Sequence, residues 1–79
     1  MKCRIANITE LDGITPKASH AHRVRRTGEL LSIRIGYPMW LAYSDDHGTL
    51  MTSTIEEINE GPSEFRVKTR SSIYVLDKV

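Results

Sequence analysis

The 79-residue sequence contains one cysteine, Cys3, so an intramolecular disulfide is excluded. No group of cysteines and histidines has zinc-site spacing, which removes a second common support of small domains. A chain of this length buries only about 60–65% of the surface that its unfolded form exposes, so its stability margin is thin. Self-association is the remaining common support, and we therefore expect a homo-oligomer.

Long hydrophobic runs are also missing. The sequence has no stretch of about 18 consecutive apolar residues, and residues 1–13 contain no apolar run that would suit a signal peptide. Together with the lone thiol, these features predict a cytoplasmic protein with no membrane contact. The formal net charge is +1, so the whole molecule is not strongly attracted to nucleic acid or anionic lipid.

The charges are segregated along the chain. No acidic residue lies between Asp12 and Glu29. That interval carries the basic residues Lys17, Arg23, Arg25 and Arg26 and the histidines His20 and His22. It shows no sustained apolar period and contains turn signals at Asp12-Gly13 and Pro16, so we predict a long basic loop at about 10–28.

Short alternating runs predict a single all-β domain over residues 1–79. The first strands are expected at about 2–9, 29–36, 39–43 and 49–58. The last two runs, 65–70 and 71–79, are either two strands or one long strand kinked near Ser71. Turn signals separate the runs at 36–38, 45–48 and 60–63. Five to six short strands predict a small antiparallel barrel or a strongly curved sheet.

The alternation also predicts which side chains face the core. One side of the runs 29–36 and 39–43 carries the expected inward residues Leu31, Ile33, Ile35, Met39, Leu41 and Tyr43. A tryptophan in so small a domain is usually a core residue. Trp40 falls on the opposite side of its run, however, so the alternative is that it belongs to an interface or a ligand wall.

The segment 54–60 has two interpretations. Ser53-Thr54-Ile55-Glu56 matches a helix capping box, and Ile55 and Ile58 are three residues apart, so a single-turn helix is one alternative. The short length and the β-branched residues favour a bent strand instead.

The segment FRVKTRSSIY, residues 65–74, contains the main candidate binding site. Neighbouring side chains of an extended chain point to opposite faces, so Arg66, Lys68 and Arg70 share one face. This basic row continues into hydroxyl residues, and guanidinium and hydroxyl groups together commonly hold phosphate oxygens. With a second hydroxyl cluster expected on the neighbouring strand, the predicted ligand-binding residues are Arg66, Lys68, Thr69, Arg70, Ser71, Ser72, Thr52 and Ser53.

An ordinary charged surface would give the same pattern. Phe65, Val67 and Thr69 would face the core, and the cations would pair with acids of the neighbouring strand. The acids available there are Glu56, Glu57 and Glu60. Whether the three cations have acidic partners therefore separates the two hypotheses.

The basic loop is the second candidate site. One interpretation is a disordered, solvated connection. In the other, Arg23, Arg25 and Arg26 form a lid or second wall over an anionic ligand, or contact a nucleic-acid backbone. His20 and His22 are a weak metal signal, because no acid or cysteine follows at ligand spacing. No metal and no cofactor are expected.

Catalytic motifs are missing from the sequence. It contains no G-x-S-x-G, no phosphate-loop glycine pattern and no H-E-x-x-H. Cys3 lies between Lys2 and Arg4, but adjacent side chains of a strand point away from it, and no general base is evident. We therefore predict that the protein is not an enzyme.

Two spaced patterns occupy the second half of the chain. They consist of Thr52, Ser53, Ile55 and Ile58, followed by Val67, Thr69, Ser72, Tyr74 and Leu76. From Gly28 to Leu76 the chain resembles a group of small proteins encoded by bacteriophages and prophages, which share Thr-Ser-x-hydrophobic-x-x-Ile and Val-x-Thr-x-Asn-Ser-x-Tyr-x-Leu. Ser71 stands where that group has Asn.

The resemblance implies an origin and a mode of action. Very small phage proteins often act by binding, for example by trapping a nucleotide immune signal of the host. We therefore predict a non-enzymatic, oligomeric anti-defence protein of the host cytoplasm that sequesters a small anionic ligand such as a nucleotide. One alternative is an inhibitor that binds a host protein through the acidic stretch Glu56 to Glu64. The other is a nucleic-acid-binding module that uses the basic loop at 17–26.

Overall fold

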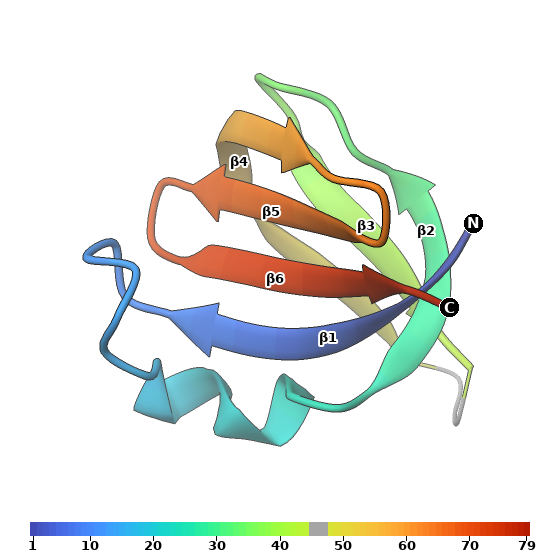
Figure 1. Ribbon diagram of the computed structural model, residues 1–79, viewed down its shortest axis with the longest axis horizontal. Coiled ribbons are helices and arrows are strands. Elements are labelled where there is room, and N and C mark those ends of the chain that lie inside the picture. Colours follow the sequence, from blue (N-terminus) through green and yellow to red (C-terminus); the bar gives the residue numbers. More distant parts are fainter. Residues whose placement is uncertain (45–47) are drawn as a thin grey trace.

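The strands form a closed antiparallel barrel. A computed structural model describes residues 1–44 and 48–79, so the predicted turn at 45–48 lies, apart from Gly48, outside the described residues. The described strands are β1 (Lys2–Thr9), β2 (Thr27–Ser32), β3 (Pro38–Tyr43), β4 (Thr49–Glu60), β5 (Glu64–Thr69) and β6 (Ile73–Lys78). Each strand pairs with the next, and β6 pairs with β1 to close the sheet (Figure 1). The prediction of a small antiparallel all-β barrel is confirmed.

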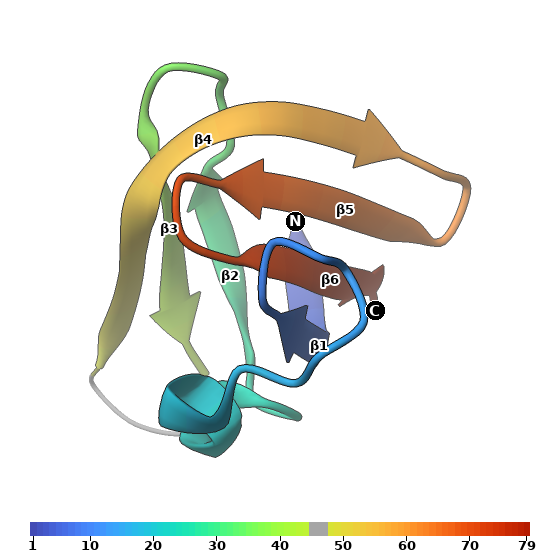
Figure 2. The same ribbon diagram turned by 90° about the vertical axis from the view of Figure 1, so that its left-hand side faces the viewer.

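β4 is the strand that bends most strongly. Its first half pairs with β3 and its second half with β5, and Figure 2 shows it curving over the barrel between them. A register shift between Ile55 and Glu57 accompanies the bend, and irregularities of this kind locally increase twist and bending. The predicted bent strand is confirmed, and the alternative helix at 54–60 is wrong.

The hydrophobic core fills the inside of the barrel. Its buried residues are Cys3, Ile5, Ile8, Met39, Leu41, Leu50, Ile55, Phe65, Val67, Tyr74 and Leu76. The prediction for β3 is confirmed, because Met39 and Leu41 are buried, Tyr43 is half-buried and Trp40 faces outward. Each large apolar side chain buried in this way contributes roughly 1.5–3 kcal/mol.

The residues of β2 that face the core differ from those predicted, so the phase of its alternation is reversed. The strand ends at Ser32, and the expected core residues Leu31 and Ile35 are 59% and 62% exposed. Leu30 packs against the core instead. Of the residues Leu31, Ile33 and Ile35, which were predicted to face the core, Ile33 alone packs against it. The prediction that Leu31 and Ile35 face the core is therefore wrong.

Gly28 explains the phase of β2. The residue is buried, and a Cβ at this position would lie 2.4 Å from the carbonyl oxygen of Ala42 on β3. The two backbones therefore approach so closely that only glycine fits, and Leu30 takes the next inward position two residues later. Alternation within the run 29–36 could not reveal this contact, because it is made with another strand.

The basic loop contains a short helix that the sequence did not predict. The 3-10 helix η1 (Ala18–Arg23) lies across one end of the barrel, below β1 in Figure 1. The N–H of Arg25 donates to the carbonyl of Ile5 at 2.7 Å, and the N–H of Ile5 donates to the carbonyl of Arg26 at 2.9 Å. Val24 packs against the core.

No helix formed by the described residues has the length and apolar character needed to cross a membrane.

β5 and β6 form a hairpin. Their register runs from Glu64 opposite Asp77 to Lys68 opposite Ile73. The turn between them is closed by a hydrogen bond from the N–H of Thr69 to the carbonyl of Ser72 at 2.8 Å. The alternative of one long kinked strand over 65–79 is therefore wrong.

Replacement of Gly28 by alanine tests the close approach of β2 and β3. The added methyl group would overlap the β3 backbone, and overpacking of this kind typically costs about 1–3 kcal/mol in the free energy of unfolding. Gly61→Ala is the matched control, because its Cβ would meet no atom closer than 3.7 Å. Urea denaturation should show a clear loss for Gly28→Ala and a change below about 1 kcal/mol for Gly61→Ala. Equal stabilities of the two variants would contradict this account of β2.

Candidate anion-binding surface

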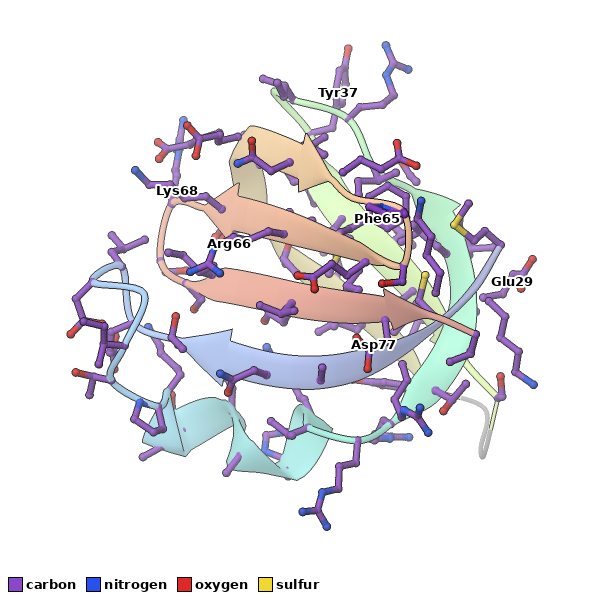
Figure 3. The ribbon with its side chains drawn as sticks, viewed as in Figure 1. Glu29, Tyr37, Phe65, Arg66, Lys68 and Asp77 are labelled. Carbon is purple, nitrogen blue, oxygen red and sulfur yellow. The ribbon has the colours of Figure 1, made fainter. Side chains whose placement is uncertain are left out.

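Alternation on β5 places the basic row outside the barrel. The inward residues of this strand are buried as predicted, and Arg66 and Lys68 project from its outer face (Figure 3). Arg70 follows in the turn between β5 and β6, where its side chain is exposed. Its N–H donates to the carbonyl of Thr54 at 3.1 Å, which fixes the turn against β4. The three cations therefore follow one another from β5 to one end of the barrel.

The three cations form no ion pair with the part of the chain that the structure describes. The register places Glu57 opposite Lys68 and Asn59 opposite Arg66. A Glu57 carboxylate oxygen instead lies 3.5 Å from the Asn59 side-chain amide. A cross-strand acid is thus present, yet it does not neutralise the basic row.

Two other lysines do have acidic partners. The Nζ atom of Lys78 lies 2.6 Å from Glu60, and that of Lys17 lies 3.2 Å from Glu10. Glu60, one of the acids expected to neutralise the basic row, is therefore paired with a different cation. The ordinary pairing that the sequence offered as an alternative is not formed between the described residues of β4 and β5.

The guanidinium group of Arg66 lies over the turn at Gly13. Its Nη2 atom is 3.3 Å from the position that a Cβ of Gly13 would occupy, and Gly13 has a φ of +76°. Glycine thus allows the turn and leaves room for Arg66. The neighbouring Asp12 carboxylate accepts bonds from the Thr15 hydroxyl and from the N–H groups of Ile14 and Thr15. These bonds lower the pKa of Asp12 and keep its carboxylate within its own turn.

The predicted hydroxyl residues divide between interior and surface. Thr52, Thr69 and Ser72 are buried. The Thr69 hydroxyl donates to the Ser72 carbonyl and accepts from the Ser72 N–H, both at 3.1 Å, so it closes the β5–β6 turn. The Thr52 hydroxyl accepts from the Met39 N–H at 2.9 Å and donates to the Ser53 carbonyl at 2.7 Å. Thr52 and Thr69 therefore stabilise the fold.

The surface hydroxyl groups are those of Ser53 and Ser71. Their Oγ atoms are 2.9 Å apart, and either can be the donor. Lys17, which was not among the predicted ligand-binding residues, also reaches this point and donates from Nζ to the Ser71 carbonyl at 2.8 Å. A bridge between Thr9 and Pro16 turns the loop back onto β1 and so brings Lys17 here. Such a long-range contact leaves no local signal in the sequence.

The arginines of the basic loop lie against tyrosines. Arg23 donates from Nη1 to the hydroxyl of Tyr74 at 2.8 Å, and the guanidinium carbon of Arg26 lies 3.4 Å from the ring centre of Tyr43. Arg25 is exposed and has a φ of 75°, which is uncommon for a residue with a side chain. Arg23 and Arg26 therefore hold η1 on the barrel, and their predicted role as a lid stays a prediction.

Cys3 lies on β1, whereas His20 and His22 lie in η1. Cys3 is fully buried, and loss of solvation raises the pKa of its thiol. No three His, Cys, Asp or Glu side chains within 1–44 and 48–79 are grouped to hold a metal ion. His20 and His22 belong to η1, where residues two apart point to different sides of a 3-10 helix.

The candidate surface is shallow. The described part of the barrel contains no cavity, so the basic row and the serine pair lie open to solvent.

Comparison of the chain with models of protein families, with curated proteins and with solved structures gave no match. The function must therefore be inferred from the chemistry of this surface.

Burial of the Tyr74 phenol makes stability depend on pH in the alkaline range. Burial raises the pKa of Tyr74 above its ordinary value of 10.0, while the charge and hydrogen bond of Arg23 oppose that rise. The folded state thus favours the neutral phenol. The resulting stability is complete below pH 10 and is lost as the pH rises through the raised pKa of the folded state.

Tyr74→Phe should therefore flatten the fall in unfolding free energy above about pH 10. Tyr37→Phe is the matched control, because the Tyr37 side chain is 53% exposed. Denaturation with urea across this pH range measures both slopes. A Tyr74→Phe slope equal to that of the unmodified chain would show that Tyr74 is not buried as a neutral phenol.

Proposed function

We propose that this chain binds a small phosphate-bearing molecule on the surface formed by Arg66, Lys68, Arg70, Ser53 and Ser71, which we call the basic row and its serine pair. The observation that supports this proposal is the lack of acidic partners of the three cations among the described residues. Phosphate oxygens would supply the negative charge that β4 does not.

Charge alone is a weak reason for binding. Successive outward residues of a strand are about 7 Å apart, and two cations at that distance repel each other by only about 0.6 kcal/mol in water. The chain can therefore tolerate the basic row without a ligand. The combination of cations with surface hydroxyl groups carries more weight, since charge-assisted hydrogen bonds are roughly twice as strong as neutral ones.

The serine pair gives the surface its short-range donors. Each hydroxyl can rotate, so the bond between Ser53 and Ser71 leaves one proton free to be donated to a ligand oxygen. Arg70 lies next to Ser71 in the chain and adds a guanidinium group that can hold two phosphate oxygens at once. Because the surface is shallow, it would bind the phosphate group and leave the rest of the ligand exposed to solvent.

A nucleotide is the ligand class that we propose. It carries phosphate and is of the size that a protein of this length can bind through a few side chains. The resemblance to phage proteins suggests a nucleotide immune signal, which would make the protein an anti-defence factor that acts in the cytoplasm of the host. Inhibition of a host protein through the acidic stretch, and nucleic-acid binding by the basic loop, are the alternatives that the experiment must separate.

Isothermal titration calorimetry against linear and cyclic nucleotides tests the proposal. Lys68→Gln and Arg70→Gln should each weaken binding about tenfold or more, because a hydrogen bond to a charged group is worth about 1.5–3 kcal/mol. Lys2→Gln is the matched control, because it removes an equal charge from an exposed residue of β1 and should leave the affinity unchanged.

The outcomes separate the candidate functions. Binding that requires phosphate and is weakened by Lys68→Gln and Arg70→Gln supports the proposal. Affinity for single-stranded oligonucleotides that falls steeply with salt and depends on Arg25 would support the nucleic-acid alternative. No heat with any nucleotide at micromolar protein would contradict the proposal. Capture of a host protein that Glu56→Lys abolishes would then favour the inhibitor.

A further inference from the structure

The outer face of β2, β3 and the first half of β4 carries an apolar row. Trp40 pairs with Ser32 on one side and with Met51 on the other, and Leu31 lies at the register shift beside Ser32. Leu31, Trp40 and Met51 are 59%, 42% and 56% exposed. They therefore form a continuous row across three neighbouring strands, of which β3 and the first half of β4 lie behind β5 and β6 in Figure 1.

The loop between β2 and β3 extends this row. Ile35 and Tyr37 are 62% and 53% exposed. Tyr37 lies directly before β3, where its carbonyl accepts the N–H of Ile55 at 2.9 Å. Figure 2 shows this loop where β2 ends and β3 begins, beside the bend of β4. We call Leu31, Ile35, Tyr37, Trp40 and Met51 the apolar face.

The strands beneath the apolar face are almost free of charge. Their outward residues are Glu29, Leu31, Pro38, Trp40, Ala42, Thr49, Met51 and Ser53. Glu29 alone among these residues is ionised, and its carboxylate lies 2.8 Å from the amino group of Met1. The face of β5, β6 and β1 differs sharply, because it presents Lys2, Arg4, Glu64, Arg66, Lys68 and Asp77. Depletion of charge with enrichment of Trp, Tyr and Met is the composition of a protein interface core.

The area of the apolar face matches that of the largest apolar patch of an ordinary monomer, a patch that is often functional. At roughly 200 Å² for each large side chain, exposures between 42 and 62% leave about 500 Å² of apolar surface. The largest apolar patch of an ordinary monomer is about 300–600 Å². Two such faces brought together would bury about 1,000 Å², which reaches the lower bound for a specific interface.

We propose that the apolar face binds a second copy of this chain and forms a symmetric dimer. In a two-fold interface the same patch meets itself, so an unpaired charge close to the two-fold axis would face its own copy. On the apolar face Glu29 is paired with the amino group of Met1, and the guanidinium group of Arg34 lies over the ring of Tyr37, 4.6 Å from its centre. The basic row lies on other strands and would stay open in the dimer. The dimer proposal therefore does not depend on the proposed nucleotide binding.

Trp40 is the only tryptophan of the chain and lies within the apolar face, so its fluorescence reports directly on the interface. Dilution of the purified protein from high micromolar to nanomolar concentration should shift its emission from the shorter wavelengths of a buried indole to those of a hydrated one. Native mass spectrometry at the upper concentration should show the dimer. A single monomeric mass and an emission maximum independent of concentration would overturn the proposal.

Met51→Lys and Leu31→Lys are the informative variants. Both positions are exposed in the single chain, so the barrel should remain folded, which circular dichroism can check. Each variant should weaken dimerisation by about 100-fold, because a lysine buried against an apolar partner has no counter-ion. Ile14→Lys is the matched control: Ile14 is 82% exposed on the loop after β1, outside the apolar face. Dimers that persist in both face variants, or that dissociate equally in Ile14→Lys, would place the interface elsewhere.

Discussion

The pairing of β6 with β1 is the constraint on which the rest of the structure depends. Cys3 to Thr9 of β1 align with Lys78 to Ile73 of β6, and this ladder closes the sheet into a barrel. Closure gives each strand one inward and one outward side, and it removes the open sheet edges that invite aggregation. The interior holds a single small core. Every cation, and every apolar side chain that the core cannot hold, must therefore lie outside.

The outside of the barrel is consequently divided into two unlike faces. β5, β6 and β1 carry charged residues that include the basic row, whereas β2, β3 and the first half of β4 carry the apolar face. The two functions that we propose, nucleotide binding and dimerisation, use different faces of the barrel. Two copies joined through their apolar faces would present two basic rows on the outside. Each site could then bind its own ligand.

Much of the fold could be predicted from the sequence because alternation is a local property. The limits of β1 and the inward residues of β3 and β5 were predicted, as was the outward position of Arg66 and Lys68. The errors arose where a contact between distant segments decides the outcome. Gly28 against Ala42 reversed the phase of β2, and the N–H of Met39 on β3 engages the hydroxyl of Thr52, which had been predicted to bind a ligand. The tyrosines that engage Arg23 and Arg26 lie far away in the sequence, so no local pattern could reveal them.

The central claim is that the basic row, which has no acidic partner among the described residues, and its serine pair hold phosphate. Amide chemical shifts measured by NMR during titration with ATP, and with adenosine as the phosphate-free control, test it most directly. The account predicts that ATP shifts the signals of Ser53, Lys68, Arg70 and Ser71, while adenosine leaves them in place. Shifts confined to η1 or to the apolar face, or equal shifts with adenosine, would contradict it.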